Sequence, residues 1–214
     1  MSTTRKERRP YDATARRAGA MRRRDDILEH ARTLFLADGY ASTTVGAIAA
    51  ASGVSPETVY KAFGGKPGIV RAIFERSLLG SASSPAEERS DTAQLQAPDA
   101  RALFRRFGEL SAEVAPLAAP MMRLIREAAA GGADTAMAAV LHDVEQARYE
   151  RMRHNADVLR QRGFLAPGMA TDHAADVMWF YTADDVFHNL VELRHWSLDR
   201  YANFIATALT SALL

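Results

Sequence analysis

The stretch from Val45 to Gly64, VGAIAAASGVSPETVYKAFG, constrains the fold of this chain more than any other. Ala49 is small enough to lie where two short helices cross, and Gly53 permits the positive φ of a tight turn. Ser55 followed by Pro56 is typical of a helix start, because serine caps free N–H groups and proline fits the first helical position. Three apolar residues are spaced to face inward, namely Ile48, Val54 and Val59. The combination predicts a helix-turn-helix.

A helix-turn-helix presents the N-terminal end of its second helix to the major groove of DNA. We expect this end to read bases, with the Glu57 carboxylate accepting from a cytosine amino group. Residues farther along the helix are placed for phosphates, and helix starts favour phosphates through their free N–H groups. The alternative is that the polar residues only cap helices and the tyrosine packs inward. The predicted DNA-contacting residues are Thr43, Thr44, Ser55, Pro56, Glu57, Thr58, Tyr60, Lys61 and Lys66.

The pattern TTVGAIAAASGVSPETVYKAFGGKPGIV, preceded by DDILEHARTLFLADGYASTTV, resembles the N-terminal domain of TetR-family bacterial regulators. The resemblance covers Arg22 to Arg76 closely and extends more loosely to a helical C-terminal part. The matching residues are Phe35, Gly39, Thr44, Ile48, Ala49, Gly53, Val54, Ser55, Thr58, Val59, Tyr60, Phe63 and Lys66. The family's phosphate contacts align with Thr44, Tyr60, Lys61 and Lys66. The sequence departs from the family at GGKPG, residues 64–68, which is richer in glycine and proline than usual.

The resemblance and the helical patterning together imply an all-α protein. We expect an N-terminal three-helix helix-turn-helix DNA-binding domain and a C-terminal helical bundle for ligand binding and dimerisation. The expected divisions are a basic, flexible arm over 1–21, the DNA-binding domain over 22–79, a connecting loop over 80–98 and the C-terminal domain over 99–214. Pro116 and Pro120 are expected to interrupt the helix that begins after Asp99, and Gly131-Gly132 to form a turn.

Charge is distributed unevenly along the chain. Residues 1–80 hold 14 Lys and Arg against 8 Asp and Glu, whereas residues 81–214 hold 13 against 18. Such asymmetry indicates that the N-terminal end meets a polyanion. By analogy with homeodomain arms, the segment before Arg22 is a candidate to enter the minor groove, and a solubilising tail is the alternative. Deletion of residues 2–20 would reject the minor-groove role if it left the operator affinity and its salt dependence unchanged.

Aromatic, methionine and polar side chains of the C-terminal half are candidates to line a pocket for a small, fairly apolar effector. Such residues are more often ordinary core, and polar neighbours on the same helix faces favour a pocket. The predicted ligand-binding residues are Phe104, Phe107, Met121, Met122, Ile125, Arg126, Tyr149, Met152, Trp179, Phe180, Asp184, Phe187 and His188.

The last two helices are the expected dimer surface, because the final helix carries an apolar stripe at helical spacing. Its members are Tyr201, Phe204, Ile205, Ala208, Leu209 and Ala212, with Val186, Leu190 and Trp196 upstream. The alternative is that this stripe is buried within its own subunit. A two-fold protein would bind a pseudo-palindromic double-stranded operator.

No cofactor, metal site or catalytic function is expected. The chain has no cysteine, phosphate-binding glycine loop, G-x-S-x-G elbow or H-E-x-x-H motif. Asp184 and His188 lie four residues apart, but no third metal ligand is evident. No apolar run approaches the about 20 residues of a membrane span, so we expect a cytoplasmic protein. The leading interpretation is a repressor released by its ligand; the alternatives are a dimeric DNA binder without a ligand and a helical enzyme with a vestigial N-terminal domain.

Overall fold

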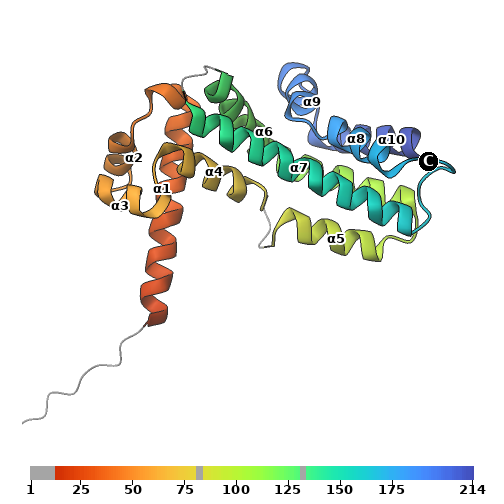
Figure 1. The fold of residues 1–214 in the computed structure, drawn as a ribbon, viewed down its shortest axis with the longest axis horizontal. Coiled ribbons are helices and arrows are strands. Elements are labelled where there is room, and N and C mark those ends of the chain that lie inside the picture. The colour runs from red at the N-terminus through yellow and green to blue at the C-terminus, as the bar shows by residue number, and fades with distance from the viewer. Residues whose placement is uncertain (1–12, 81–83, 131–133) are drawn as a thin grey trace, which may run out of the picture.

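All regular structure in the described residues is helical. The computed structural model describes residues 13–80, 84–130 and 134–214. The helices are α1 (Ala13–Ser42), α2 (Val45–Ala51), α3 (Pro56–Phe63), α4 (Lys66–Ser77), α5 (Ala86–Gln96), α6 (Ala100–Ala130), α7 (Thr135–Gln161), α8 (Thr171–Tyr181), α9 (Asp184–Phe187), the π-helix η1 (His188–Leu193) and α10 (Leu198–Leu213). The predicted all-α fold is confirmed (Figure 1). None of the described helices combines the length and apolar composition that a membrane-spanning segment requires.

Helices α1 to α4 enclose one apolar core at one end of the molecule (Figure 1). Ile27, Ala31 and Phe35 recur at helical spacing along α1 and are at most 2% exposed. They pack with buried residues of the next three helices, among them Ile48, Val59 and Ile69. The helical backbone of α1 is interrupted at Gly39, whose φ of 79° lies in the left-handed region. The predicted helix-turn-helix is therefore present as two short helices on a third.

Helices α6 and α7 are the long elements of the C-terminal part (Figure 1). Helix α10 packs along α6, and α8 packs on α7. The approach of α10 is close because Gly108 of α6 faces the Ala202 carbonyl of α10, where a Cβ atom would have no room. Met121, Ile125 and Val140 belong to the same apolar cluster as the core of the N-terminal helices. Helix α4 thus joins the two parts through shared packing.

The prediction of a connecting loop over residues 80–98 is wrong, because this segment contains helix α5. Two acidic residues, Glu87 and Glu88, lie in its first turn, where their negative charges stabilise the helix by interacting with its dipole. Its buried side chains are Ser90 and Gln94, and Gln94 Nε2 donates to Asn155 Oδ1 of α7 at 2.9 Å. Because the buried face of α5 is polar, no apolar periodicity marks it in the sequence.

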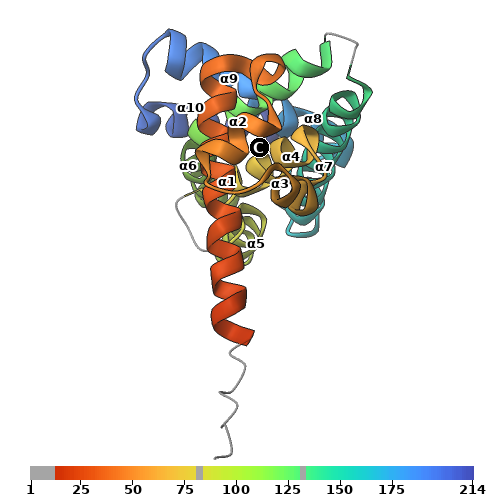
Figure 2. The same ribbon diagram turned by 90° about the vertical axis from the view of Figure 1, so that its left-hand side faces the viewer.

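Two other helix boundaries differ from expectation. Helix α6 continues through Pro116 and Pro120 as one helix from 100 to 130, although each proline removes a backbone donor. Packing against α4, α7 and α10 holds the helix on both sides of the prolines. Helix α1 begins at Ala13, so residues 13–21 of the expected arm are helical, and they project beyond the other helices in both ribbon views (Figures 1 and 2). The rest of that arm and Gly131-Gly132 lie outside the described residues.

Candidate DNA-binding surface and effector cavity

The turn between α2 and α3 is built from local contacts. Thr44 caps α2, its Oγ1 accepting from Ala47 N at 3.0 Å, and Ser55 caps α3, its Oγ accepting from Thr58 N at 3.3 Å. Gly53 has a φ of 64°, which only glycine adopts without strain. The inward residues of both helices are buried, so the two helices are held rigidly against α1 and α4.

Seven of the nine predicted DNA-contacting residues are exposed: Thr44, Ser55, Pro56, Glu57, Thr58, Tyr60 and Lys61. They lie on α2 and α3 or at their starts, at the end of the molecule away from α8 and α10 (Figure 1). Hydrogen bonds from the backbone N–H of Glu57 and from Ser55 hold the pKa of the Glu57 carboxyl below its usual range. Glu57 is therefore an ionised acceptor at the N-terminal end of α3.

The side chains of the other two residues, the buried Thr43 and the half-buried Lys66, form hydrogen bonds within the protein. Thr43 is 3% exposed, and its hydroxyl donates to the Gly39 carbonyl at 2.8 Å. Lys66 Nζ donates to the Tyr40 carbonyl at 2.7 Å and lies 4.2 Å from the centre of the Tyr40 ring. The Tyr40 hydroxyl in turn donates to Asp134 Oδ2 at 2.7 Å, at the start of α7. These side chains connect α1, α4 and α7 and do not face outward with the other seven.

The glycine-rich connection between α3 and α4 has a steric cause. Gly64 ends α3 with a φ of 75°, and Gly65 follows with a φ of 131°. A Cβ atom on Gly68 would collide with the carbonyl of Phe63. Arg24 of α1 also binds this corner, since its Nη1 donates to the Ala62 carbonyl at 3.3 Å. These contacts fix the position of α3 relative to α4. The sequence did not indicate that Arg24 takes part in them.

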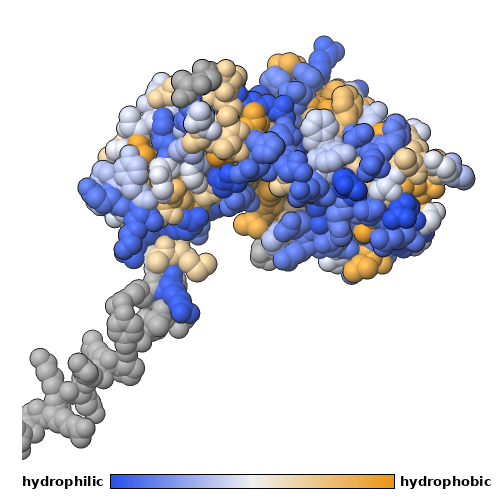
Figure 3. All heavy atoms as spheres, in the orientation of Figure 1, coloured by the Kyte–Doolittle hydropathy of each residue, from blue (hydrophilic) through white to orange (hydrophobic). Residues whose placement is uncertain are grey.

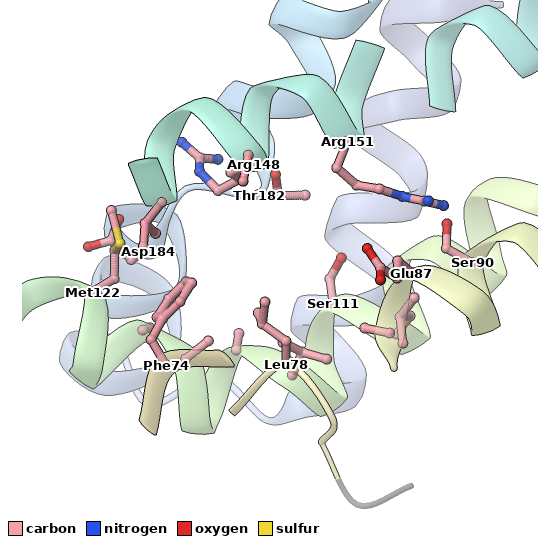
Figure 4. Close-up of a pocket in the computed structure, with 18 of the residues that line it drawn as sticks. Phe74, Leu78, Glu87, Ser90, Ser111, Met122, Arg148, Arg151, Thr182 and Asp184 are labelled. Atoms are coloured by element: carbon pink, nitrogen blue, oxygen red, sulfur yellow. The ribbon is translucent and has the colours of Figure 1, made fainter. Parts of the chain in front are cut away.

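A cavity of about 550 Å³ lies among α4, α5, α6, α7 and the α8–α9 connection (Figure 4). This volume is within the range of about 300–1,000 Å³ that is typical of small-molecule sites. Most of its wall is apolar, including Phe74, Leu78, Leu79, Phe107, Leu110, Val114, Met122, Val144, Met152 and Phe187. The arrangement can hold a small molecule with a largely apolar body.

Two buried polar residues of the wall, Asp184 and Asn155, have an atom without a hydrogen-bond partner among the described residues, as do the half-buried Arg148 and Arg151. Asp184 Oδ1 accepts from Arg126 Nη2 at 2.9 Å, but its Oδ2 has no partner, and burial raises the pKa of this carboxyl. In Asn155 one amide atom pairs with Gln94 and the other with nothing. Unpaired buried polar groups are costly, so both residues are candidates to bind a ligand.

Five of the thirteen predicted ligand-binding residues line the cavity: Phe107, Met122, Met152, Asp184 and Phe187. Phe104, Met121 and Ile125 are at most 1% exposed and lie in the apolar core instead. The remaining five, which do not line the cavity, are Arg126, Tyr149, Trp179, Phe180 and His188. Helical spacing identifies an inward face but does not separate a packed face from one that borders a cavity.

Helices α4 and α5 supply wall residues that sequence reasoning missed, such as Phe74, Leu78, Glu87 and Ser90 (Figure 4). Phe74 and Leu78 were expected in the DNA-binding domain over 22–79, and Glu87 and Ser90 in a connecting loop over 80–98. Asp184 and His188, which lie four residues apart, do not pair with each other, because His188 Nδ1 forms a hydrogen bond with Glu192 Oε2 at 2.7 Å. Among the described residues no three metal-binding side chains come together.

The apolar stripe of the last helix packs mainly within the chain. Tyr201, Ile205 and Leu209 are at most 1% exposed, and α10 lies along α6. A second face remains accessible, where edge-to-face aromatic contacts link Phe180, Tyr181, Phe204 and Trp196 across α8 and α10. Exposed apolar side chains near this row are Phe180, Leu193 and Leu198, and apolar residues are visible on this end of the molecule in Figure 3.

Comparisons with known proteins agree with this geometry. Residues 27–73 match the family model described as bacterial regulatory proteins, tetR family. No protein of curated function matches the chain significantly in sequence.

Several solved structures share the fold. The fatty acid degradation regulator FadR from Bacillus halodurans is 16% identical, with a TM-score of 0.70 over 89% of this chain and 96% of that one. GusR from Salmonella enterica is 19% identical, with a TM-score of 0.66 over 95% and 99%. The SmeT–triclosan complex is 22% identical, with a TM-score of 0.70 over 90% and 92%. At these identities the likeness concerns the fold alone.

Proposed function

We propose that this chain, of which residues 27–73 match the model of the tetR family of bacterial regulatory proteins, is a DNA-binding transcriptional regulator of that family. In this proposal it is a dimeric repressor released from its operator by a small, fairly apolar effector. The observation that carries the proposal is the position of α4. Its N-terminal end adjoins α3, whereas Phe74 and Leu78 at its other end form part of the cavity wall. A molecule that fills the cavity therefore contacts the helix that supports the DNA-binding surface.

The exposed face of α2 and α3 supports the DNA-binding half of the proposal. Glu57 and Thr58 lie at the N-terminal end of α3, where side chains reach base edges, and Tyr60 and Lys61 lie where phosphates pass. We expect the first pair to set the preferred sequence and the second pair to add affinity to all sequences. Thr44 and Ser55 serve as caps in the free protein and offer helix starts to phosphates.

The aromatic row on α8 and α10 supports dimerisation. Phe180 is 61% exposed, and it adjoins a half-buried surface that includes Tyr181, Phe204 and Trp196. Exposed aromatic residues with a polar surround are typical of protein interfaces. We expect a two-fold pairing through this face to present two copies of α3 to successive major grooves of a pseudo-palindromic operator.

Release by an effector would follow from a difference in its affinity for two spacings of α3. In the solved complex of the similar protein SmeT, the ligand is triclosan, and FadR is described as a regulator of fatty acid degradation. The triclosan complex supports a small, fairly apolar effector for this chain. The cavity also favours an effector-controlled repressor over a dimeric DNA binder without a ligand. The C-terminal part of a ligand-free dimer would be expected to have a core without a cavity.

Selection of bound sequences from random DNA, followed by fluorescence anisotropy of the selected operator, tests the proposal. We expect a palindromic site, binding tighter than random DNA by about 10³-fold or more, and release of the operator by a subset of apolar compounds. Phe74→Trp, which narrows the cavity, should reduce sensitivity to those compounds without loss of operator binding. Equal affinity for operator and random DNA at moderate salt would contradict the proposal.

A further inference from the structure

The arginines of the cavity wall are all neutralised by carboxylates. Arg71 Nη2 lies 2.6 Å from Asp143 Oδ2, and Arg151 Nη2 lies 2.5 Å from Asp91 Oδ1. Arg148 Nη2 lies 3.0 Å from Glu145 Oε2, and its Nη1 also donates to the Trp179 carbonyl at 2.8 Å. Each wall arginine in the described residues thus has a carboxylate partner, although Arg148 Nη2 and Arg151 Nε lack a hydrogen-bond partner.

Carboxylates are in excess around the same cavity. Glu75 and Glu87 belong to the wall, and no ion pair is found for either one within the described part of the chain. When the wall and its ion-pair partners are taken together, Arg71, Arg126, Arg148 and Arg151 face Glu75, Glu87, Asp91, Asp143, Glu145 and Asp184. Carboxylates therefore outnumber arginines around the cavity, which favours a cation over an anion.

The unpaired oxygen of Asp184 can accept a hydrogen bond from a cationic group in the cavity. The side chain is 5% exposed, and Arg126 binds only its Oδ1. Rotation of the carboxylate about its last torsion is soft, so Oδ2 can turn to a donor in the cavity. Asp184 lies with Met122 and Phe74 at one end of the cavity, and Phe187 follows it by one turn (Figure 4). Aromatic faces beside a carboxylate suit an ammonium group.

We infer that the effector is an apolar amine, whose ammonium group donates to Asp184 and whose hydrocarbon body fills the space between α4 and α7. The inference rests on the proposed function, in which the cavity is the effector site. The charges of Arg126 and Arg148 balance those of Glu145 and Asp184 at this end of the cavity. The main attraction for the ammonium group is therefore its hydrogen bond to the free oxygen of Asp184, and Glu75 and Glu87 add a weaker one.

Three probes with the same ten-carbon chain test the inference: n-decylamine, 1-decanol and decanoate. Their dissociation constants for the full-length protein are measured by isothermal titration calorimetry at neutral pH. A hydrogen bond to a charged group adds about 1.5–3 kcal/mol, so we expect decylamine to bind about tenfold or more tightly than decanol. Decanoate should bind more weakly than decanol.

Variants locate the effect. Asp184→Asn keeps the shape of the side chain, and it should bring the affinity for decylamine to within about threefold of that for decanol while decanol binding stays unchanged. Ser111→Ala is the matched control, because it alters the wall without altering charge. Glu87→Gln, at an exposed position of α5, should weaken only decylamine, by about twofold.

Operator binding is followed in the same samples, so that the two proposals fail separately. Equal binding of the three probes, tightest binding of decanoate, or no binding of any probe would overturn the amine inference. If decanoate alone releases the operator, the effector-controlled repressor stands and the amine does not. Absence of sequence-specific DNA binding before any probe is added would instead contradict the proposed function.

Discussion

Two lysines near the DNA-binding surface have different roles because their surroundings differ. Lys61 is exposed on α3, whereas Lys66 at the start of α4 donates to the Tyr40 carbonyl and lies over its ring. Both residues were predicted to hold DNA phosphates, and the family resemblance implied the same. In the structure the Lys66 side chain donates to a carbonyl 26 residues away in the chain, a contact that no local sequence pattern predicts.

Lys61→Ala should therefore weaken binding to all DNA sequences without changing the free energy of unfolding. Loss of one phosphate contact lowers the slope of log affinity against log salt by about 1. Lys66→Ala is the comparison, and it should lower stability by about 1 kcal/mol or more through its lost hydrogen bond. Salt-dependent anisotropy and urea unfolding measure the two effects. Identical behaviour of the two variants would contradict this division.

Glu57→Gln should change which sequence is preferred. The pKa of Glu57 is lowered by its hydrogen bonds with its own backbone N–H and with Ser55, so the side chain is an acceptor at neutral pH. Glutamine can also donate, and the discrimination of one base pair, worth about 1–3 kcal/mol, should relax. Selection from random DNA with each protein gives the comparison. Identical selected sites would show that Glu57 does not contact a base.

At the scale of elements, two glycines set how closely neighbouring helices approach. Gly68 allows α4 to begin against the Phe63 carbonyl, and Gly108 allows α10 to lie on α6. Neither glycine has a positive φ, so their requirement is steric rather than conformational.

Gly108→Ala should destabilise the C-terminal part by about 1–3 kcal/mol, because its Cβ would overlap the Ala202 carbonyl and separate α6 from α10. Urea unfolding measures the loss. Gly19→Ala in α1 is the control, since a Cβ there meets nothing within 4 Å. Alanine is the better helix former, so the control should be neutral or more stable by up to about 1 kcal/mol. A Gly108 variant of unchanged stability would refute the close packing.

The start of α7 should make stability depend on pH. Asp134 Oδ1 caps α7 by accepting from Ala136 N and Met137 N, both at 3.1 Å, and its Oδ2 accepts from Tyr40. The hydrogen bond from Tyr40, followed by the backbone hydrogen bonds, lowers the pKa of Asp134. Its contribution is therefore present above the unfolded-state pKa and is lost as pH falls through the lower, folded-state pKa.

Asp134→Ala should remove that part of the acid-dependent loss, so that the free energy of unfolding falls less steeply below about pH 4. Urea unfolding at a series of acidic pH values gives the two curves. Tyr40→Phe should have a smaller effect of the same sign, because it leaves the two backbone hydrogen bonds in place. Parallel curves for wild type and Asp134→Ala would contradict the role of Asp134.

At the scale of the whole molecule, α4 connects the proposed DNA-binding surface with the cavity. Arg71 of α4 pairs with Asp143 of α7 at 2.6 Å on the cavity wall, and the apolar residues of α4 share a core with α1, α6 and α7. A shift of α4 therefore moves both the wall of the cavity and the support of α3. We expect the aromatic row on α8 and α10 to convert this shift into a change of spacing between two subunits.

Phe180→Asp should convert a dimer into a monomer, since a charge at the centre of an apolar interface is costly. The side chain is 61% exposed, so the subunit fold should persist. Sedimentation velocity measures the assembly, and affinity for the full operator should fall while that for a half-site is kept. Leu95→Asp, at an 82% exposed position on α5, is the control and should leave the dimer intact. A dimeric Phe180 variant would place the interface elsewhere.

The sequence by itself determined the helix-turn-helix, because Ala49, Gly53, Ser55 and Pro56 act through contacts within a few residues. Helical spacing likewise predicted the all-α fold. Only the tertiary structure showed that α5 is a helix with a polar buried face and that α6 runs through its prolines. It also showed that Phe74 and Ser90 border a cavity, whereas Met121 and Ile125 fill a core. The reason is physical: a cap or a turn is a local interaction, but a cavity is the space that distant helices leave unfilled.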